Sequence, residues 1–188
     1  MGRHPKARQT VLSAARRIVI ERGAGALTFE ELAAESGVTR GGITYHFSTK
    51  EDLLAALVEE DIKQWREVGE SLAPPELDYV TGELVASIRH AACKAAGEEN
   101  RRFVSGMIAA AALNPVLLQP CRDYFQSLFP KGRWSERDLR RALVRLAADG
   151  LFWTEVFDLY EFPPSARKRL VALMEQLAID AGDTPPSD

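Results

Sequence analysis

The chain has 188 residues, of which 46% are hydrophobic and 27% are charged, and its formal net charge at pH 7 is −3. This composition is ordinary for a globular protein of one or two domains. No apolar run approaches the roughly 18 residues of a membrane span, and the basic N-terminus lacks the apolar segment of a secretory signal peptide. We therefore expect a cytoplasmic protein that does not bind membranes, in which Cys93 and Cys121 are reduced and buried.

Charge is unevenly distributed along the chain. Residues 1–50 contain eight Lys and Arg residues against four Glu residues, a net charge of +4, which leaves −7 for the remainder. A basic first part on an acidic body is expected when one end of a protein meets the phosphates of nucleic acid. Chance clustering of surface charge is the alternative explanation.

Apolar residues recur at helical spacing along almost the whole chain, and no strand pattern is found. The first helix is expected over about residues 6–22. It buries Val11, Ala15, Ile18 and Val19, and it ends at Gly23.

Residues 28–47 predict two short helices joined by a tight turn. Thr28 and Glu31 have the spacing of a capping box, which starts the first of them. Gly37 suits the left-handed conformation that ends it, and Thr39 can cap the second. A helix, a tight turn and a short second helix are how a helix-turn-helix presents its recognition helix to the major groove of DNA.

The second of these helices has an inner and an outer face. Ile43 and Phe47 lie four residues apart and face the interior. The residues left to solvent are Arg40, Thr44, Tyr45 and His46. Gly41 and Gly42 each cost roughly 1 kcal/mol of helix stability relative to Ala. Two explanations stay open for them: close approach of the helix to the DNA backbone, or tight packing within the domain.

Six further helices are expected. Ser48 and Glu51 again have capping-box spacing, and a helix follows over about residues 49–72. Its length exceeds what the N-terminal part can cover, so it must also pack against the second half of the chain. The others are expected over about residues 78–96, 98–113, 116–129 and 135–160, and beyond Pro164, followed by a disordered tail at 182–188.

The most specific pattern is Gly37-Val38-Thr39-x-Gly41, then Tyr45-His46-Phe47, then Lys50-Glu51-x-Leu53. With Ala14-Ala15 and Glu21-Arg22-Gly23 upstream, it resembles the DNA-binding domain of the TetR family of bacterial transcriptional regulators, without gaps over about residues 8–55. The resemblance implies an all-α fold of about nine helices. A three-helix helix-turn-helix DNA-binding domain would cover residues 1–50, and a helical ligand-binding and dimerisation domain residues 51–188.

The residues expected to contact DNA are Thr28, Thr39, Arg40, Gly41, Thr44, Tyr45, His46 and Lys50. Arg40 lies in the first turn of the recognition helix, where its fork fits guanine O6 and N7; a phosphate contact is the alternative. Tyr45 and His46 are expected on backbone phosphates, with capping as the alternative for His46. Lys50 combines its charge with the free N–H groups of the next helix start, which suits a phosphate.

One position departs from the family pattern. Most members carry Tyr where this chain has Thr44, and its own Tyr45 comes one residue later. Thr44 is therefore a candidate for a base contact, with its methyl group against a thymine.

In the family, the helices that follow the DNA-binding domain enclose a ligand pocket. The residues expected to line it here are Ile62, Trp65, Ile88, Phe103, Met107 and Phe125. Ordinary core packing explains these residues equally well. No charged residue lies on their helical faces, so an effector would be apolar or aromatic.

The last two helices are expected to form a dimer interface. The positions assigned to it are Leu143, Ala147, Leu151, Thr154, Leu170, Leu173, Met174 and Leu177. The resemblance implies that this helix pair meets its two-fold mate in a four-helix bundle; a monomer core is the alternative. A single DNA-binding domain reads only a few base pairs, which also favours a dimer.

Catalysis has little support in the sequence. His90 and Cys93 stand three residues apart, but no second ligand pair exists, so neither a metal nor another cofactor is expected. No Glu-x-x-His pair, phosphate loop or nucleophile elbow is found. We expect a homodimeric repressor released from operator DNA by a small effector. The alternatives are a DNA-binding regulator controlled by a protein partner or by no ligand, and a helical enzyme or carrier indifferent to DNA.

Overall fold

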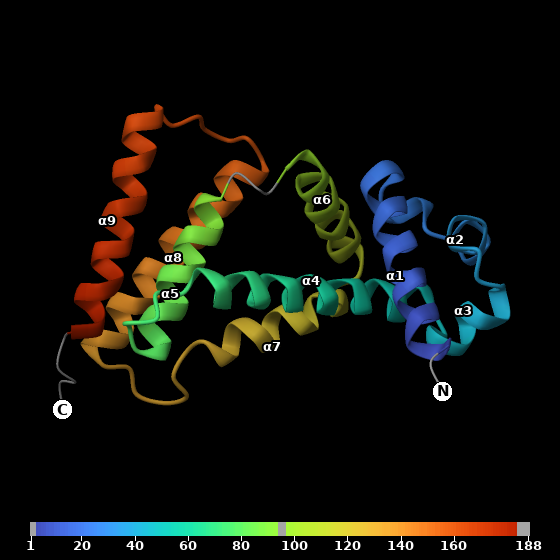
Figure 1. The fold of residues 1–188 in the computed structure, drawn as a ribbon, viewed down its shortest axis with the longest axis horizontal. Coiled ribbons are helices and arrows are strands. Elements are labelled where there is room, and N and C mark those ends of the chain that lie inside the picture. Colours follow the sequence, from blue (N-terminus) through green and yellow to red (C-terminus); the bar gives the residue numbers. More distant parts are fainter. Residues whose placement is uncertain (1–2, 94–96, 184–188) are drawn as a thin grey trace. The chain divides into compact units, whose positions relative to one another are not determined.

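The computed structural model describes residues 3–93 and 97–183, and throughout those ranges the regular structure is helical (Figure 1). The α-helices are α1 (Arg3–Arg22), α2 (Phe29–Ser36), α3 (Arg40–His46), α4 (Lys50–Leu72), α5 (Tyr79–Ala92), α6 (Glu98–Leu113), α7 (Gln119–Ser127), α8 (Glu136–Val156) and α9 (Pro164–Asp183). Short 3₁₀ turns lie at Ala24–Ala26 and Pro115–Leu118. The predicted all-α fold is confirmed. None of the described helices combines the length and apolarity that crossing a membrane requires.

The chain divides into two compact units. Unit 1 comprises residues 1–63 and 97–124, and unit 2 comprises residues 64–96 and 125–188. Helix α4 contributes its first part to unit 1 and its last part to unit 2, as its length predicted. Unit 1 also takes in α6, which the sequence assigned to the C-terminal part. These compact units do not test the predicted division into a DNA-binding domain at residues 1–50 and a ligand-binding and dimerisation domain at 51–188, which stays a prediction.

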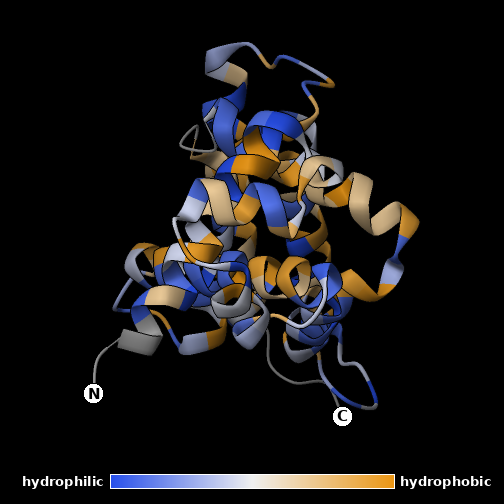
Figure 2. Cartoon of the chain, turned by 90° about the vertical axis from the view of Figure 1, so that its right-hand side faces the viewer, coloured by the Kyte–Doolittle hydropathy of each residue, from blue (hydrophilic) through white to orange (hydrophobic). Residues whose placement is uncertain are grey.

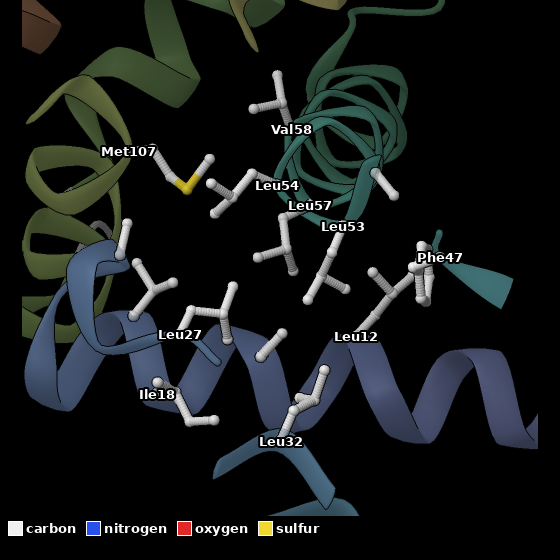
Figure 3. Close-up of a cluster of buried hydrophobic side chains, with 14 of the residues drawn as sticks. Leu12, Ile18, Leu27, Leu32, Phe47, Leu53, Leu54, Leu57, Val58 and Met107 are labelled. Atoms are coloured by element: carbon white, nitrogen blue, oxygen red, sulfur yellow. The ribbon is translucent and has the colours of Figure 1, made fainter. Parts of the chain in front are cut away.

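Unit 1 is built around one apolar cluster to which α1, α2, α3, α4 and α6 all contribute. Figure 3 shows side chains such as Leu12, Leu32, Leu53 and Met107 pointing toward one another from these helices. Burying a Leu, Ile or Phe side chain stabilises a fold by about 1.5–3 kcal/mol. The cluster therefore fixes the short helices α2 and α3, which are too short to be stable alone.

Unit 2 has its own core, in which α5, α8 and α9 pack side by side (Figure 1). Its buried members are Leu84, Val85, Ile88, Val144, Ala148, Leu151, Met174 and Ala178. A hydrogen bond and an ion pair also join α8 to α5. The buried guanidinium of Arg145 donates to Ser87 Oγ at 2.7 Å and pairs with Glu83. In Figure 2, hydrophobic and hydrophilic residues alternate along individual helices, as expected when each helix buries one face.

Several helix ends differ from the sequence-based expectation. The start of α4 is capped by Thr49 and Asp52, which exchange two hydrogen bonds of 3.0 Å, and not by Ser48 and Glu51. Helix α8 ends at Val156, four residues earlier than predicted. Helix α9 runs to Asp183, so the first two residues of the predicted tail, 182 and 183, are helical.

Helix α6 covers its predicted range, but α5 ends at Ala92, before the predicted end at residue 96, and α7 covers only residues 119–127 of the predicted 116–129. A 3₁₀ turn precedes α7, which places Pro120 in the first turn of that helix, where proline is tolerated. Residues 94–96, predicted to end the fifth helix, and residues 184–188 of the predicted tail lie outside the described residues.

The prediction that both cysteines are buried is wrong for Cys93. Its side chain is exposed just beyond the end of α5, and Cys121 is half-buried in unit 1. Burial raises the pKa of the Cys121 thiol, with the nearby Asp61 carboxylate as a smaller cause. The structure has no disulfide between these two cysteines, and their reduced state stays a prediction.

Candidate nucleic-acid interface

Local hydrogen bonds define the turn between α2 and α3. Thr28 accepts a hydrogen bond from the Glu31 N–H at 3.1 Å and caps α2. Gly37 adopts the left-handed conformation with φ 68°, and its N–H donates to the Ala33 carbonyl at 3.0 Å. Thr39 then caps α3 by accepting from the Gly42 N–H at 3.2 Å. The predicted caps and turn are confirmed, and they set the angle at which α3 leaves α2.

Helix α3 is held by its inner face and open on its outer face. Ile43 is 0% exposed and Phe47, just beyond the helix end, is 3% exposed. Arg40, Thr44 and Tyr45 are exposed as predicted, with Tyr45 at 74%. The adjoining His46 is half-buried, with its ring edge-on to Tyr45 at 5.1 Å between centroids. Helix α3 is thus anchored by its inner face and presents polar side chains on its outer face.

The two glycines of α3 have different explanations. A Cβ added to Gly42 would lie 2.9 Å from Val38 Cγ1 and 3.3 Å from Thr39 Oγ1, so a side chain at position 42 would crowd the turn before α3 and displace Val38. A Cβ added to Gly41 would meet no atom within 4 Å. Packing therefore does not account for Gly41, and close approach of the helix to DNA stays open there.

Two candidate DNA contacts make hydrogen bonds within the protein. The Thr44 hydroxyl donates to the Gly41 carbonyl at 3.2 Å. Its hydrogen bond to its own helix leaves the methyl group as the part of Thr44 suited to a base. Lys50 Nζ donates to the Gly25 carbonyl at 3.2 Å, which holds the ammonium near the turn before α2.

The acidic residues of α2 neutralise arginines of neighbouring helices. Glu31 pairs with Arg22 at 2.6 Å, and this hydrogen bond raises the pKa of the Arg22 guanidinium. Glu35 pairs with Arg17 at 2.9 Å. Glu30 pairs with Arg40, the residue expected to read a base. Sequence reasoning assigned these glutamates no part in the site beyond the cap. Only the folded arrangement shows which arginine each one meets.

Comparison with known proteins agrees with this geometry. Residues 11–57 match the family model described as "Bacterial regulatory proteins, tetR family", and residues 82–179, more than half of the chain, match "Tetracyclin repressor-like, C-terminal domain". The chain belongs to the TetR family. Proteins of this family are transcriptional regulators and not enzymes, as the sequence predicted for this chain.

Curated relatives resemble only part of this TetR-family chain. The transcriptional repressor AcnR of Corynebacterium diphtheriae is 43% identical over 61 residues, which is 32% of each chain. The repressor BepR of Brucella suis is 39% identical over 51 residues, 27% of this chain and 24% of that protein. The chain thus spans a third or less of the length of the curated relatives it matches.

Solved structures share the whole fold. A regulator of Streptomyces coelicolor, SCO7518, superposes with a TM-score of 0.69 at 17% identity and covers 96% of this chain and 100% of that one. The multidrug binding protein EbrR, solved in complex with ethidium, has a TM-score of 0.63 at 22% identity and covers 92% of this chain and 98% of that one. At such identities the likeness shows the fold alone.

The six residues predicted to line a ligand pocket of this TetR-family chain fall in both units. Ile62, Phe103 and Met107 belong to unit 1, where Phe103 and Met107 are buried in the core. Trp65, Ile88 and Phe125 belong to unit 2, and Ile88 is 0% exposed. Core packing therefore accounts for Ile88, Phe103 and Met107, and a shared pocket stays a prediction.

An aromatic cluster in unit 2 escaped the sequence analysis. Trp65 stacks on His90 with 3.9 Å between ring centroids, and Phe152 meets Trp65 edge-on at 5.2 Å. The sequence pattern makes His90 a candidate metal ligand and does not predict this aromatic contact. Among the described residues, no group of three or more His, Cys, Asp and Glu is placed to hold a metal ion.

The predicted dimer residues divide into two groups. Leu143, Leu173 and Leu177 are 45–67% exposed, Ala147 is exposed, and Thr154 and Leu170 are half-buried. The assignment is wrong for Leu151 and Met174. Each is 4% exposed because it packs inside the core of unit 2.

The exposed apolar side of α8 is a neighbouring stripe that was only partly predicted. Its members are Leu139, Leu143, Leu146, Gly150 and Trp153 of α8, and Phe157 just beyond the helix end. They alternate spacings of four and three residues, the repeat of a helix that packs along a partner helix. We call this stripe the α8 seam.

Proposed function

We propose that the chain is a cytoplasmic, homodimeric repressor that binds operator DNA through α2 and α3 and is released by a small apolar or aromatic effector. The observation that carries the DNA-binding part is the exposed outer face of α3, fixed by the Thr39 cap and by the buried anchors Ile43 and Phe47. Two curated relatives, each similar to part of this chain, are named as repressors.

The α8 seam supports the homodimer. An exposed stripe that includes Leu143, Leu146 and Trp153 is unusual on a monomer surface and is typical of a surface that another protein covers. A second copy would also double the number of bases read. Two domains separated by about one helical turn of DNA, 34–36 Å, would bind a palindromic operator.

Helix α4 supports effector control, because it contributes to both units. A ligand that favours one arrangement of this helix would change operator affinity by its differential affinity for the two arrangements. EbrR, which shares the fold, is described as a multidrug binding protein. The aromatic cluster of Trp65, His90 and Phe152 is the part of unit 2 best suited to an aromatic effector.

One observation favours the alternative, a regulator that no ligand gates or that a protein partner controls. Three of the residues predicted to line a pocket, Ile88, Phe103 and Met107, are buried in the two cores. Buried core residues need no effector to explain them.

Selection of bound fragments from genomic DNA by the purified full-length chain tests the proposal. We expect enrichment of a palindromic sequence bound by two copies of the chain. The selected operator is then titrated in the presence of a panel of aromatic and apolar compounds. Lack of any enriched sequence contradicts the repressor. An operator whose affinity no compound changes contradicts the effector and supports the alternative.

A further inference from the structure

Glu30 and Arg40 form an ion pair on the exposed surface of the helix-turn-helix. Glu30 lies in the first turn of α2, and Arg40 is the first residue of α3. Their side chains are 67% and 66% exposed. The carboxylate of Glu30 accepts from Arg40 Nη1, and the guanidinium has four further N–H groups for other partners.

Glu30 stands where a DNA-binding surface has reason to avoid negative charge, because a carboxylate repels phosphates. Arg40, conversely, lies at the N-terminus of α3, where the helix dipole disfavours a cation. The ion pair reduces the unfavourable interaction of Arg40 with the helix dipole, since Glu30 neutralises the guanidinium. It also restrains a long side chain that otherwise samples many rotamers.

The pair changes which DNA atoms Arg40 prefers. An unpaired arginine binds any phosphate, because the attraction between their charges is independent of sequence. An arginine already paired with a carboxylate gains less from a phosphate, and the carboxylate itself repels that phosphate. Guanine O6 and N7 are neutral acceptors, so the remaining N–H groups can still donate to a base edge.

We propose that Glu30 is a specificity-determining residue, which directs Arg40 toward a base edge and away from the phosphate backbone. The inference rests on the proposed operator binding. Glu30 acts through Arg40 and is a positioning residue, so its removal alters the ratio of operator to non-operator affinity.

The same helix supplies a matched control. Glu35 pairs with Arg17 of α1, a helix that does not carry the candidate base contacts. Replacing either glutamate by glutamine changes the net charge by the same amount. Exposed ion pairs contribute little to folding, so neither variant is expected to unfold. Circular dichroism and a thermal melt confirm this for each protein.

The test measures full-length wild type, E30Q, E35Q, R40A and the E30Q/R40A double variant. The probes are the operator selected by the wild-type protein and a scrambled duplex of equal length and base composition, each over a range of salt concentrations. We expect E30Q to lower the ratio of operator to scrambled affinity about five-fold or more, because the discrimination of one bidentate base contact is lost. Binding of E30Q to the scrambled duplex should tighten, with a salt slope steeper by about 0.9, as one more phosphate is neutralised.

The control variants separate this mechanism from a general charge effect. E35Q should leave the affinity ratio unchanged, and E30Q should have no further effect on the ratio when Arg40 is already Ala. The inference is overturned by an unchanged ratio in E30Q, by an equal change in E35Q, or by an E30Q effect that persists without Arg40. If the wild-type protein selects no operator, the proposed function itself fails.

Discussion

The guanidinium carbon of Arg16 on α1 lies 3.8 Å from the centre of the Phe103 ring on α6. Arg16 also donates to Asp61 of α4 at 2.8 Å and to Asn100 of α6 at 3.3 Å. One side chain thus joins three helices of unit 1. Helices α1 and α6 also approach closely at Gly106 of α6, where an added Cβ would lie 3.0 Å from Val19 Cγ1 on α1. Helix α6 is therefore an integral part of the unit that carries α2 and α3.

Arg16→Ala should lower the free energy of unfolding by about 1–2 kcal/mol, since it removes a partly buried ion pair and a cation–π contact together. Arg17→Ala is the control, because the adjacent Arg17 side chain is 51% exposed and makes only an ion pair with Glu35 among the contacts described. Urea denaturation measures both variants. Equal losses in the two would show that the Phe103 contact contributes nothing.

Gly41→Ala and Gly42→Ala should have different effects on stability. Alanine at 41 has open space and should stabilise the fold by about 0.4–1 kcal/mol. Alanine at 42 must displace Val38, and the strain should cancel or exceed that gain. Thermal melts compare the two. If Gly41 serves close approach to DNA, Gly41→Ala should also weaken operator binding; unchanged affinity would exclude that role.

Leu146→Glu should convert the proposed dimer to a monomer, because it places a charge in the α8 seam. The Leu146 side chain is 64% exposed, so the fold of unit 2 should persist. Leu113→Glu is a matched control at a 91% exposed leucine of α6. Sedimentation velocity at micromolar concentration gives the mass. A Leu146→Glu protein that remains dimeric would exclude the seam as the interface.

Lys50→Ala should reduce the steepness of the salt dependence of operator binding by about 0.9 if Lys50 contacts one phosphate. The Gly25 carbonyl that Lys50 binds in the free protein is a weaker partner than a phosphate. A fluorescence-anisotropy titration over salt concentration gives the slope. An unchanged slope would remove Lys50 from the interface.

Asp149→Asn should raise stability at neutral pH. Burial raises the pKa of Asp149, and the Arg145 charge offsets only part of that rise. The folded state therefore binds a proton more tightly than the unfolded state, so stability falls as pH rises through the window above the usual pKa. The advantage of the Asn variant should shrink as pH falls through the raised pKa toward the usual one, and it should be absent below the usual carboxyl pKa. A pH-independent difference would contradict this explanation.

Asp138→Asn should lower stability at neutral pH, the opposite of the effect expected for Asp149→Asn. Hydrogen bonds from Ser135 lower the pKa of Asp138, which completes the capping box of α8. Its contribution is present above the usual carboxyl pKa and is lost as pH falls through the lowered one. The Asn variant should therefore be less stable at neutral pH and equal to the wild type in acid. Urea denaturation at several pH values tests both carboxyl groups.

Structural features that depend on residues close in sequence could be predicted from the sequence. The caps at Thr28 and Thr39 and the left-handed Gly37 form within four residues of chain. The start of α4 shows the limit of such signals. Two overlapping capping boxes compete there, one from Ser48 and one from Thr49, and both have the required spacing. In the folded chain the box of Thr49 and Asp52 is the one that forms.

Which face of a helix is buried and which is exposed depended on how the helices pack. On α8, the stripe through Leu151 and the stripe through Leu146 are both apolar, so hydrophobic spacing does not tell which one is buried. Packing of α5 and α9 buries Leu151 and leaves Leu146 exposed. The sequence likewise does not tell which glycine of α3 is needed for packing. In the structure Val38 lies against position 42 and leaves open space at position 41.

The sequence by itself determined the all-α class, the helix-turn-helix and its outer face, because hydrogen bonds and apolar spacing within a few residues suffice for these. The tertiary structure alone decided that Arg16 meets Phe103, that Glu30 meets Arg40, and that the exposed seam of α8 runs through Leu146. Each of these depends on residues brought together from separate helices. Such contacts arise from the packing of whole helices, which no local pattern specifies.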